Sequence, residues 1–404
     1  MDFSPSAEMQ TRLDRAQQLL CDEVMPLEPA LFTDGFNALL PRLQAVRDRV
    51  REAGLWAPHM PADDGGSGLS LVDLGLLSEV LGQSPLGHFA FGCQAPDAGN
   101  MELLHKYGTD PQKKRFLLPL VAGDVRSCFG LTEPNNPGSN PTRLSTTATR
   151  VDGGWKLQGE KWFTSSVDGA DFCIVMAVTD ADAAVHERAT MFIVPTSTDG
   201  FVHQRNIPIM GHAGEGYFSH GQVELHDVVV DDDAVLGPVG KGFVLAQERL
   251  GPGRIHHCMR WLGICQRAFD MMVDRAATRM LDDTTVLGDK GMVQAFIAES
   301  RAEMSAARLL TLQAAWTIDH HGFKAARDDI SLIKFHVAKV MQNVVDRAIQ
   351  VHGALGITDD TPLAFFWGHE RGARIYDGPD EVHKESFARR LIRRRQKALA
   401  GGEA

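Results

Sequence analysis

The sequence lacks the cysteine pairs that mark a disulfide framework or a zinc site. Its 404 residues include six cysteines, and none of them forms a Cys-x-x-Cys pair: Cys21, Cys93, Cys128, Cys173, Cys258 and Cys265. This scatter is typical of reduced thiols in a cytosol-like compartment. We therefore expect no bound metal and a cytoplasmic location.

Long hydrophobic runs are also missing. The longest, Phe172 to Val178, is far shorter than the roughly 20 apolar residues of a membrane-spanning helix. The first residues, Met1 to Ser4, do not begin a basic stretch followed by an apolar core, as a secretory signal would. We expect a soluble protein with no membrane partner.

Positive charge is in short supply, with 41 Lys and Arg against 52 Asp and Glu, a net charge of −11. A net negative chain repels a phosphate backbone, so a nucleic-acid partner is not expected. The basic run Arg389 to Arg395 is better explained as the solvated face of a C-terminal helix. With 44% hydrophobic residues, the chain has the composition of an ordinary globular protein.

No Gly-x-Gly-x-x-Gly loop follows a predicted strand, and strands do not alternate with helices, which argues against a Rossmann domain. Apolar residues instead recur at helical spacing, then at a period of two, then at helical spacing again. The pattern predicts an α+β protein with an N-terminal helical bundle, a central antiparallel β-barrel or sandwich, and a C-terminal helical bundle. The expected domains are residues 1–125, 126–237 and 238–404.

Two stretches illustrate these periods. Thr147 to Val151 and Trp155 to Leu157 alternate on either side of Asp152-Gly153-Gly154, which predicts a β-hairpin. One apolar stripe at helical spacing lies in the last third of the chain: Ile333, Val337, Val340, Val344, Ala348 and Val351.

Two segments of the central region could bind a ligand. Cys128 to Pro134 leads into a turn rich in hydroxyl, amide and glycine groups, which can offer donors to an anionic or heterocyclic ligand. Gly159 to Ser166 has two aromatic residues followed by hydroxyls. Taken alone, an ordinary strand-end loop and core packing explain them equally well.

Four later segments stand out. His256 and His257 are adjacent in one of them, so they point to different faces of a helix and cannot share a metal. The four segments are Leu236 to His257, Arg275 to Arg279, Gln350 to Gly356, and Arg374 to His383.

Together, the order and spacing of the six segments resemble the acyl-CoA dehydrogenase family over nearly the whole chain. Asp377 to His383 most resembles the branch that contains the mammalian family members ten and eleven. The resemblance implies the three-lobe fold of that family, FAD as cofactor, and dehydrogenation of an acyl-CoA thioester to the trans-2-enoyl-CoA. It also implies a homodimer or homotetramer, with an electron-transferring flavoprotein as the electron acceptor.

The resemblance assigns roles to residues around the flavin. Thr132 and Ser165 would hydrogen-bond the isoalloxazine edge, and Phe129 and Phe163 would pack against the ring. Phe163 replaces the usual Trp, and Ser165 the usual Thr. Asp282 stands where Phe is usual in the segment whose arginine reaches the FAD of a neighbouring subunit. The expected FAD contacts are Phe129, Thr132, Ser139, Phe163, Ser165, Arg279, Gln350, Gly353, Pro379 and Glu381.

By the same resemblance Asp377 is the general base, and Arg254 lies close to its carboxylate. Gly253 stands where some members carry an acidic base. Removing a proton next to a thioester requires a desolvated carboxylate and donors that stabilise the developing enolate oxygen. The expected substrate contacts are Ser139, Phe243, Leu250, Arg254, Tyr376 and Gly378.

Two alternatives stay open. An aspartate base also serves nitroalkane oxidation, so a nitroalkane-oxidase-like or acyl-CoA-oxidase-like flavoprotein on the same fold is one. The other, of a different class, is a catalytically silent acyl-CoA-binding scaffold.

Overall fold

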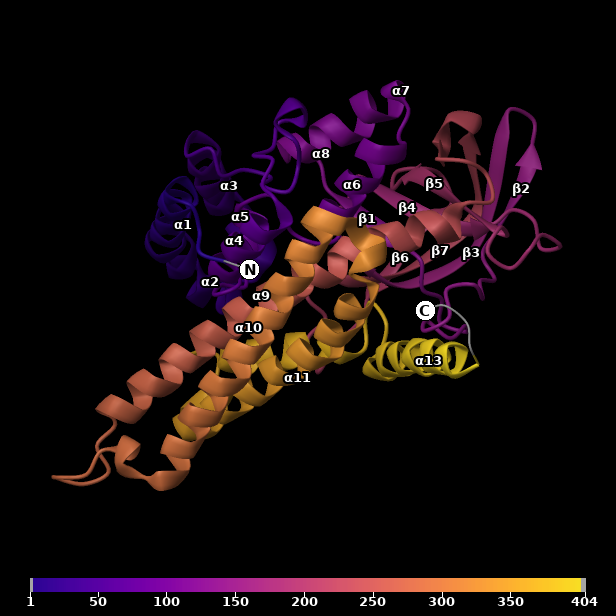
Figure 1. The fold of residues 1–404 in the computed structure, drawn as a ribbon. Helices are drawn as coiled ribbons and strands as arrows, with labels where there is room; N and C mark the ends of the chain where they lie inside the picture. The colour runs from indigo at the N-terminus through magenta and orange to yellow at the C-terminus, as the bar shows by residue number, and fades with distance from the viewer. Residues whose placement is uncertain (1–2, 401–404) are drawn as a thin grey trace. The chain divides into compact units, whose positions relative to one another are not determined.

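The computed structural model describes residues 3–400, apart from the side chains of Leu250 and Pro252. Helices form the first and last parts of the chain and strands the middle part, as Figure 1 shows by colour. This order confirms the fold class predicted from the hydrophobic periods. The chain folds as two compact units: unit 1 comprises residues 3–29, 70–87 and 254–400, and unit 2 comprises residues 30–69 and 88–253.

Unit 1 is helical. Its main helices are α1 (Ala7–Leu19), α4 (Leu71–Leu81), α10 (Gly291–Ala325), α11 (Arg327–His352), α12 (Leu363–His369) and α13 (Asp380–Leu399). Short π or 3₁₀ turns connect them at Leu20–Val24, Met25–Leu27, Leu287–Asp289, Gly353–Ile357 and Glu370–Arg374. Three helices include residues of both units: α2 (Glu28–Asp34), α5 (Gly87–Ala90) and α9 (Gly242–Thr278).

The core of unit 1 lies along α11. All six residues of the predicted apolar stripe are buried there, among side chains of α9 and α10 such as Trp261 and Ala307. Helix α4 is tied to α10, because both carboxylate oxygens of Asp319 accept hydrogen bonds from the free N–H groups of Leu71 and Val72. Figure 1 shows α10 and α11 as two long neighbouring helices. This helical framework carries the segment from Glu370 to α13.

Unit 2 combines short helices with one sheet. Its helices are α3 (Phe36–Glu52), α6 (Asp97–Tyr107), α7 (Asp110–Gln112) and α8 (Leu118–Ala122), with a π turn at Lys113–Leu117 and 3₁₀ turns at Ala62–Asp64, Gly216–Phe218 and Asp232–Ala234. Its strands are β1 (Ser127–Gly130), β2 (Thr147–Val151), β3 (Gly154–Ser165), β4 (Phe172–Val178), β5 (Ala189–Pro195), β6 (Phe201–Asn206), β7 (His220–Asp231) and β8 (Val235–Leu236).

The predicted hairpin is confirmed, since β2 and β3 pair antiparallel with Val151 opposite Gly154, and Gly153 has the positive φ of +76° that this short turn needs. The sheet is not closed as a barrel, which corrects one of the two forms expected. Its order is β6-β7-β3-β2-β4-β5-β8, with β1 beside β4, and the β1–β4 and β2–β4 pairs are parallel. A period of two identifies strands but specifies neither partner nor direction.

The sheet encloses its own core instead. Apolar side chains of β3 and β7 pack in one cluster with those of β4 and β5, and the rings of Trp155 and Phe192 lie 5.6 Å apart. Strand β4 is buried along nearly its whole length, which explains its unbroken apolar sequence. The loops that leave β1 and β3 therefore start from a rigid base.

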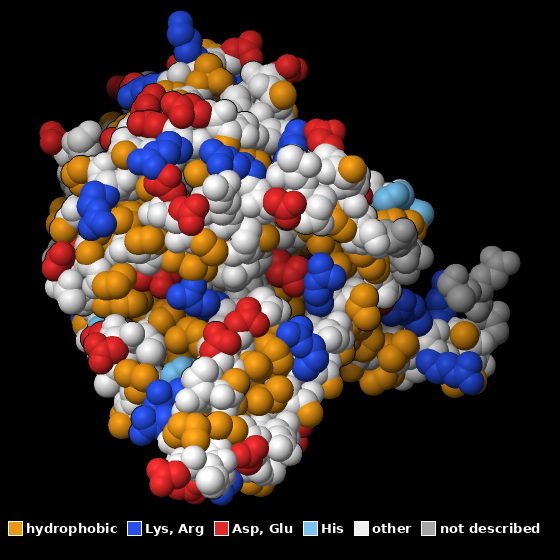
Figure 2. Space-filling model, turned by 90° about the vertical axis from the view of Figure 1, so that its left-hand side faces the viewer, with side chains coloured by type: hydrophobic (Ala, Val, Ile, Leu, Met, Phe, Trp, Pro, Cys, Tyr) orange, Lys and Arg blue, Asp and Glu red, His pale blue; other side chains and the backbone are white. Residues whose placement is uncertain are grey.

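The surface carries charges of both signs. On the face shown in Figure 2, acidic and basic side chains are interspersed among hydrophobic ones. Within residues 3–400, no helix combines the length and the apolar character needed to cross a membrane.

Candidate active site

Asp377 lies in a tight turn between the 3₁₀ turn Glu370–Arg374 and α13. Both Asp377 and Gly378 are left-handed, with φ of +53° and +96°. A Cβ at Gly378 would lie 2.8 Å from Nε2 of His383, so the turn requires glycine there. The left-handed conformation costs an L residue about 1 kcal/mol, so contacts must hold Asp377 in it.

Two side chains hold the backbone of Asp377 itself. Arg254 donates from Nε to the Asp377 carbonyl oxygen at 3.0 Å, and His383 donates from Nε2 to the same oxygen at 3.1 Å. Burial, with a smaller effect from the Arg254 charge, lowers the pKa of His383 to about 4. His383 is therefore a neutral donor, and the two contacts fix the carbonyl on one side.

A third donor reaches the turn from α11. Lys334 is fully buried, and its ammonium donates to the carbonyl oxygens of Ala373 at 2.7 Å and Gly378 at 3.3 Å. Burial lowers the pKa of Lys334, against the attraction of the Asp377 carboxylate. The lysine thus clamps both ends of the segment that contains Asp377.

The side chain that contacts the Asp377 carboxylate is a histidine. Nε2 of His257, on α9, lies 3.1 Å from Oδ2, and the Asp377 side chain is 20% exposed. Burial opposes ionisation, yet the hydrogen bond from His257 and the positive charges of Arg254 and Lys334 outweigh it. They hold the pKa of Asp377 below its ordinary value, so the carboxylate is ionised at neutral pH.

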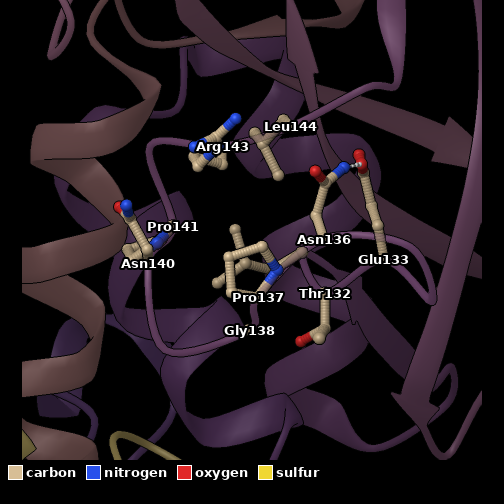
Figure 3. Close-up of a pocket in the computed structure, with 10 residues that line it drawn as sticks. Thr132, Glu133, Asn136, Pro137, Gly138, Asn140, Pro141, Arg143 and Leu144 are labelled. Carbon is tan, nitrogen blue, oxygen red and sulfur yellow. Dashed lines mark hydrogen bonds between the residues drawn. The ribbon is translucent and has the colours of Figure 1, made fainter.

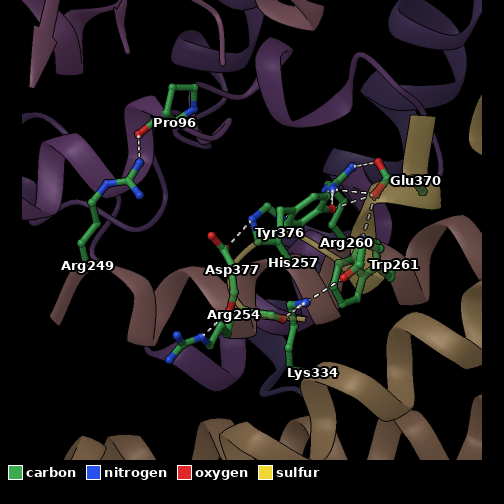
Figure 4. A network of polar contacts seen from close by, with 12 residues as sticks. Pro96, Arg249, Arg254, His257, Arg260, Trp261, Lys334, Glu370, Tyr376 and Asp377 are labelled. Carbon is green, nitrogen blue, oxygen red and sulfur yellow. Dashed lines mark hydrogen bonds and ion pairs between the residues drawn. The ribbon is translucent and has the colours of Figure 1, made fainter. Parts of the chain in front are cut away.

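A buried ion pair lies behind this carboxylate (Figure 4). Glu370 accepts hydrogen bonds from both Nη atoms of Arg260, from Nε1 of Trp261 at 2.9 Å and from the Tyr376 hydroxyl at 3.1 Å. Burial alone would raise the pKa of Glu370, but Arg260 and His369 hold it well below the ordinary value. Both carboxylate oxygens of Glu370 are therefore occupied, and the role of Glu370 is structural.

Asp377 differs from Glu370 in one respect. Oδ1 of Asp377 accepts no hydrogen bond from any described residue, and in Figure 4 it points away from His257. An ionised carboxylate with one free, partly exposed oxygen can take a proton from a ligand. Residues 3–400 contain no cluster of three His, Cys, Asp or Glu that could hold a metal ion.

In unit 2 the loop after β1 is built around a second buried ion pair. Glu133 and Lys161 are both buried and lie 2.7 Å apart, and Lys161 also donates to the Leu131 carbonyl at 3.2 Å. The loop closes over a small pocket whose wall includes Thr132, Asn136 and Arg143 (Figure 3). The pair fixes the pocket's polar wall at the end of β1.

The predicted aromatic contact at Phe163 is prominent. A register shift between β3 and β7 lies between Lys161 and Thr164, and Phe163 within it has φ of +50°. The irregularity turns the ring outward, where it is 41% exposed. The hydroxyl of Thr164 is buried without a hydrogen-bond partner among the described residues.

The other residues predicted near the flavin lie close by in unit 2. The backbone N–H of Trp162 donates to the Thr132 carbonyl at 3.0 Å, which joins the two predicted segments. The Ser165 hydroxyl lies 2.8 Å from Nδ1 of His220, and Phe129 lies half-buried beneath the guanidinium of Arg249 at 4.1 Å. Ser139 is exposed on the pocket loop.

The residues predicted to reach a neighbouring subunit's FAD lie on the surface of unit 1. Arg279 is exposed just beyond α9, and Gln350 and Gly353 are exposed at the end of α11. Arg275, four residues before Arg279, is more enclosed. Its Nε is buried without a hydrogen-bond partner among the described residues, and its charge acts on His352.

The remaining predicted contacts are spread over both units. In unit 1, Tyr376 donates a hydrogen bond to Glu370, Pro379 occupies the N-cap position of α13, and Glu381 is exposed in the first turn of that helix. In unit 2, the Phe243 ring stacks on His186 with centroids 4.4 Å apart. The side chain of Leu250 lies outside the described residues.

Sequence reasoning missed His257 and Lys334. The sequence excludes a metal shared by His256 and His257 but does not indicate that the ring of His257 faces a carboxylate. Lys334 carried a usable signal, because it lies in register with Val337 and Met341 on the apolar face of α11. A charged residue within a buried stripe requires a polar partner, here two carbonyl oxygens.

Comparison with known families covers almost the whole chain. Residues 6–124 match the N-terminal domain of acyl-CoA dehydrogenase, residues 128–228 its middle domain and residues 240–392 its C-terminal domain.

Individual relatives agree. The Mycobacterium tuberculosis protein FadE2, described as a probable acyl-CoA dehydrogenase, is 40% identical over 99% of both chains. Acyl-CoA dehydrogenase family member 10 of Mus musculus is 38% identical over 92% of this chain, and this chain spans 36% of that longer protein. The match confirms the predicted likeness to the branch that contains members ten and eleven. The structure of butyryl-CoA dehydrogenase from Megasphaera elsdenii superposes with a TM-score of 0.85 at 26% identity, covering 97% of this chain and all of the other. The chain therefore belongs to the acyl-CoA dehydrogenase family of oxidoreductases.

Proposed function

We propose that this protein is an FAD-dependent acyl-CoA dehydrogenase that converts an acyl-CoA to the trans-2-enoyl-CoA, with Asp377 as the general base. The observation that carries the proposal is the Asp377 carboxylate itself. It is held in a strained turn, ionised by its surroundings, and bonded through one oxygen only among the described residues.

The proposed reaction begins with a proton. Asp377 takes the proton from the carbon next to the thioester carbonyl, and Oδ1 is the oxygen free to receive it. The hydrogen bond from His257, with the positive charges of Arg254 and Lys334, keeps the base ionised against the effect of burial before substrate arrives. A ligand that displaces water from the turn would strengthen Asp377 as a base, because desolvation favours its neutral form.

The residues of unit 2 fit a flavin. The outward Phe163 ring offers a face for an aromatic ring system, Thr132 and Ser165 offer hydroxyls, and Thr164 has a buried hydroxyl without a partner. When bound, FAD would supply the two-electron acceptor for the hydride lost from the substrate β-carbon. Phe129 and Ser139 are further proposed FAD contacts in unit 2, and Pro379 and Glu381 are proposed FAD contacts in unit 1.

The proposal extends to assembly and electron transfer. Arg279, Gln350 and Gly353 would reach the FAD of a neighbouring subunit in a homodimer or homotetramer, and Arg275 has a buried Nε free for the same purpose. An electron-transferring flavoprotein would reoxidise the flavin. The proposed acyl-CoA contacts are Arg254, Tyr376 and Gly378 in unit 1, and Ser139 and Phe243 in unit 2.

The first experiment mixes the purified yellow protein anaerobically with acyl-CoAs of graded chain length and follows the flavin absorbance band. Bleaching by at least one acyl-CoA, with the trans-2-enoyl-CoA as product, is expected. No bleaching by any acyl-CoA, with tight acyl-CoA binding retained, would replace the proposal by a silent binding scaffold.

A second experiment identifies the electron acceptor. The reduced protein is mixed with O₂ or with oxidised electron-transferring flavoprotein, and reoxidation is followed by stopped flow. Faster reoxidation by the flavoprotein is expected. Rapid reoxidation by O₂ would favour an acyl-CoA oxidase, and bleaching by nitroalkanes alone would favour a nitroalkane oxidase.

A further inference from the structure

His257 lies between the proposed base and the buried ion pair behind it. On one side its Nε2 is 3.1 Å from Oδ2 of Asp377, and on the other its Nδ1 is 3.5 Å from Nη2 of Arg260. His257 and Arg260 are three residues apart on α9, so they share one face of the helix. The imidazole is thus contacted at both of its nitrogen atoms.

Arg260 decides which nitrogen of His257 carries the proton. A guanidinium has only donors, so the Nδ1 that faces it must present its lone pair. The proton that the ring donates then belongs on Nε2, where Oδ2 of Asp377 accepts it. Arg260 cannot turn away, because Glu370 binds both of its Nη atoms.

Packing fixes the plane of the imidazole. The ring of Trp261 lies nearly parallel to it, at 5.8 Å and 17°, and the ring of Tyr376 lies 5.0 Å away. Exchange of the two nitrogens by a ring flip would break both polar contacts at once. The packing of Trp261 and Tyr376 and the contact with Arg260 therefore favour the ring orientation in which Nε2 faces Asp377.

The polar and charged groups around His257 come from four elements: α9, α11, the 3₁₀ turn Glu370–Arg374 and the turn before α13. Arg260 lies on α9, as does the neighbouring His256, whose burial lowers its pKa to about 4 and keeps it neutral. Asp377 and Tyr376 lie on the turn before α13, and Glu370 lies beyond Arg260. Lys334 on α11 and Arg254 on α9 act on the turn that carries Asp377.

We propose that His257 is a positioning residue for Asp377: Arg260 faces its Nδ1, its Nε2 donates to Oδ2, and this contact holds the carboxylate so that Oδ1 faces the substrate α-proton. The inference rests on the proposed function, since it assigns His257 a part in presenting that base. It predicts that His257 affects the rate of proton removal and leaves acyl-CoA binding nearly unchanged, because the imidazole acts through Asp377.

The kinetic test compares two substitutions in the FAD-loaded protein, using an acyl-CoA that bleaches the wild type. His257→Leu removes the donor and should slow flavin reduction about 100-fold, the effect of misplacing a reacting group by about 1 Å. His257→Gln keeps an N–H donor near the position of Nε2 and should recover most of the rate. The acyl-CoA dissociation constant should stay within about threefold in both variants.

His320→Gln on α10 is the control, since His320 is exposed and remote in sequence from the turn. It should match the wild type. Equal loss in the Gln and Leu variants, or a weaker dissociation constant with an unchanged rate, would overturn the positioning role. If no acyl-CoA bleaches the wild type, the proposed function fails instead.

A spectroscopic test does not depend on activity. ¹⁵N-histidine labelling of the holoprotein reports the tautomer of each imidazole, and the signal absent from His257→Gln identifies His257. We expect the ring proton on Nε2 and a lone pair on Nδ1, because the guanidinium of Arg260 faces Nδ1. A proton on Nδ1 instead would overturn the inference.

Discussion

Two buried lysines, one in each unit, hold two functional loops in different ways. In unit 2, Lys161 pairs with the Glu133 carboxylate and donates to one carbonyl oxygen. In unit 1, Lys334 has no carboxylate partner among the described residues and donates to the carbonyl oxygens of Ala373 and Gly378.

The two carboxylates differ accordingly. Both oxygens of Glu133 are occupied, by Lys161, the backbone N–H groups of Ser145 and Thr146, and the Asn136 amide. At Asp377 the cations bind backbone carbonyls instead, and only His257 reaches the carboxylate among the described residues. Positive charge therefore lies near Asp377 without occupying its carboxylate. This is the difference between Glu133, whose carboxylate stabilises a loop, and Asp377, whose carboxylate can react.

Asp377→Asn should produce the largest effect, because it removes the proposed base, whose Oδ1 accepts no hydrogen bond from any described residue. Flavin reduction by acyl-CoA should fall by about 10³ to 10⁴, the range of a lost general base, with FAD and acyl-CoA still bound. Rapid-mixing absorbance at the flavin band measures it, and Asp359→Asn, at an exposed position, is the control. Near-normal reduction would mean that another residue is the base.

Asp377→Glu keeps the carboxylate but changes its position, so it tests whether the position matters as well as the charge. The added methylene extends the side chain by on the order of 1.5 Å in a turn already confined by Gly378 and His383. We expect much of the rate to be lost through crowding. A fully active Glu variant would keep Asp377 as the base but contradict a geometry fitted to aspartate.

The sequence predicted much of the fold because hydrophobic period reports directly on burial. The α11 stripe and the β2–β3 hairpin both appear where the period places them. The open, partly parallel sheet could not be predicted, since the pairing of β1 with β4 depends on contacts 45 residues apart in the chain, such as Cys128 with Cys173.

Some residues of the candidate site could also be predicted from the sequence, and others could not. Asp377 and Arg254 could be found by their resemblance to a family, and the structure brings Arg254 to the Asp377 carbonyl oxygen. His257, Arg260 and Glu370 could not, because their partnership joins α9 to a segment 110 residues later through buried polar contacts. Nothing in the local sequence of either segment specifies such a pair.

Lys161→Met tests the loop-building carboxylate. It leaves Glu133 buried without its counter-charge, and the free energy of unfolding should fall by about 3–5 kcal/mol. Urea unfolding followed by fluorescence measures the loss. The double variant Lys161→Met with Glu133→Gln should recover part of it, and a double variant as unstable as the single would show that the pair does not act as a unit.

Lys334→Met is the matched change in unit 1. It leaves two carbonyl oxygens without their donor, so unfolding should become easier by about 1–3 kcal/mol. It also removes a positive charge near Asp377, so the pKa of that carboxylate should rise. Lys339→Met, exposed on the same helix, is the control. A larger loss than for Lys161→Met would reverse the comparison.

Acid should weaken the Glu133 loop. Burial raises the pKa of Glu133, but Lys161 and the hydrogen bonds from Ser145 and Thr146 outweigh it and hold the pKa at about 2. Because this is below the unfolded value, the stabilisation is complete above about pH 4.5 and is lost as pH falls toward 2. The loss should be on the order of 2 kcal/mol at pH 3. Unfolding of the wild type should therefore depend on pH in this window more steeply than that of the double variant.

Arg254→Gln should give the smallest effect, because Arg254 contacts the carbonyl of Asp377 and not its carboxylate. Glutamine can keep a hydrogen bond to that oxygen but removes the charge that helps to keep Asp377 ionised. Flavin reduction should slow by roughly tenfold, about 1.4 kcal/mol, while the acyl-CoA dissociation constant changes much less. Arg389→Gln, exposed on α13, should leave both unchanged. A change confined to the dissociation constant would make Arg254 a contact for the bound acyl-CoA. Arg254 would then not be one of the donors that hold the Asp377 backbone and leave its carboxylate available.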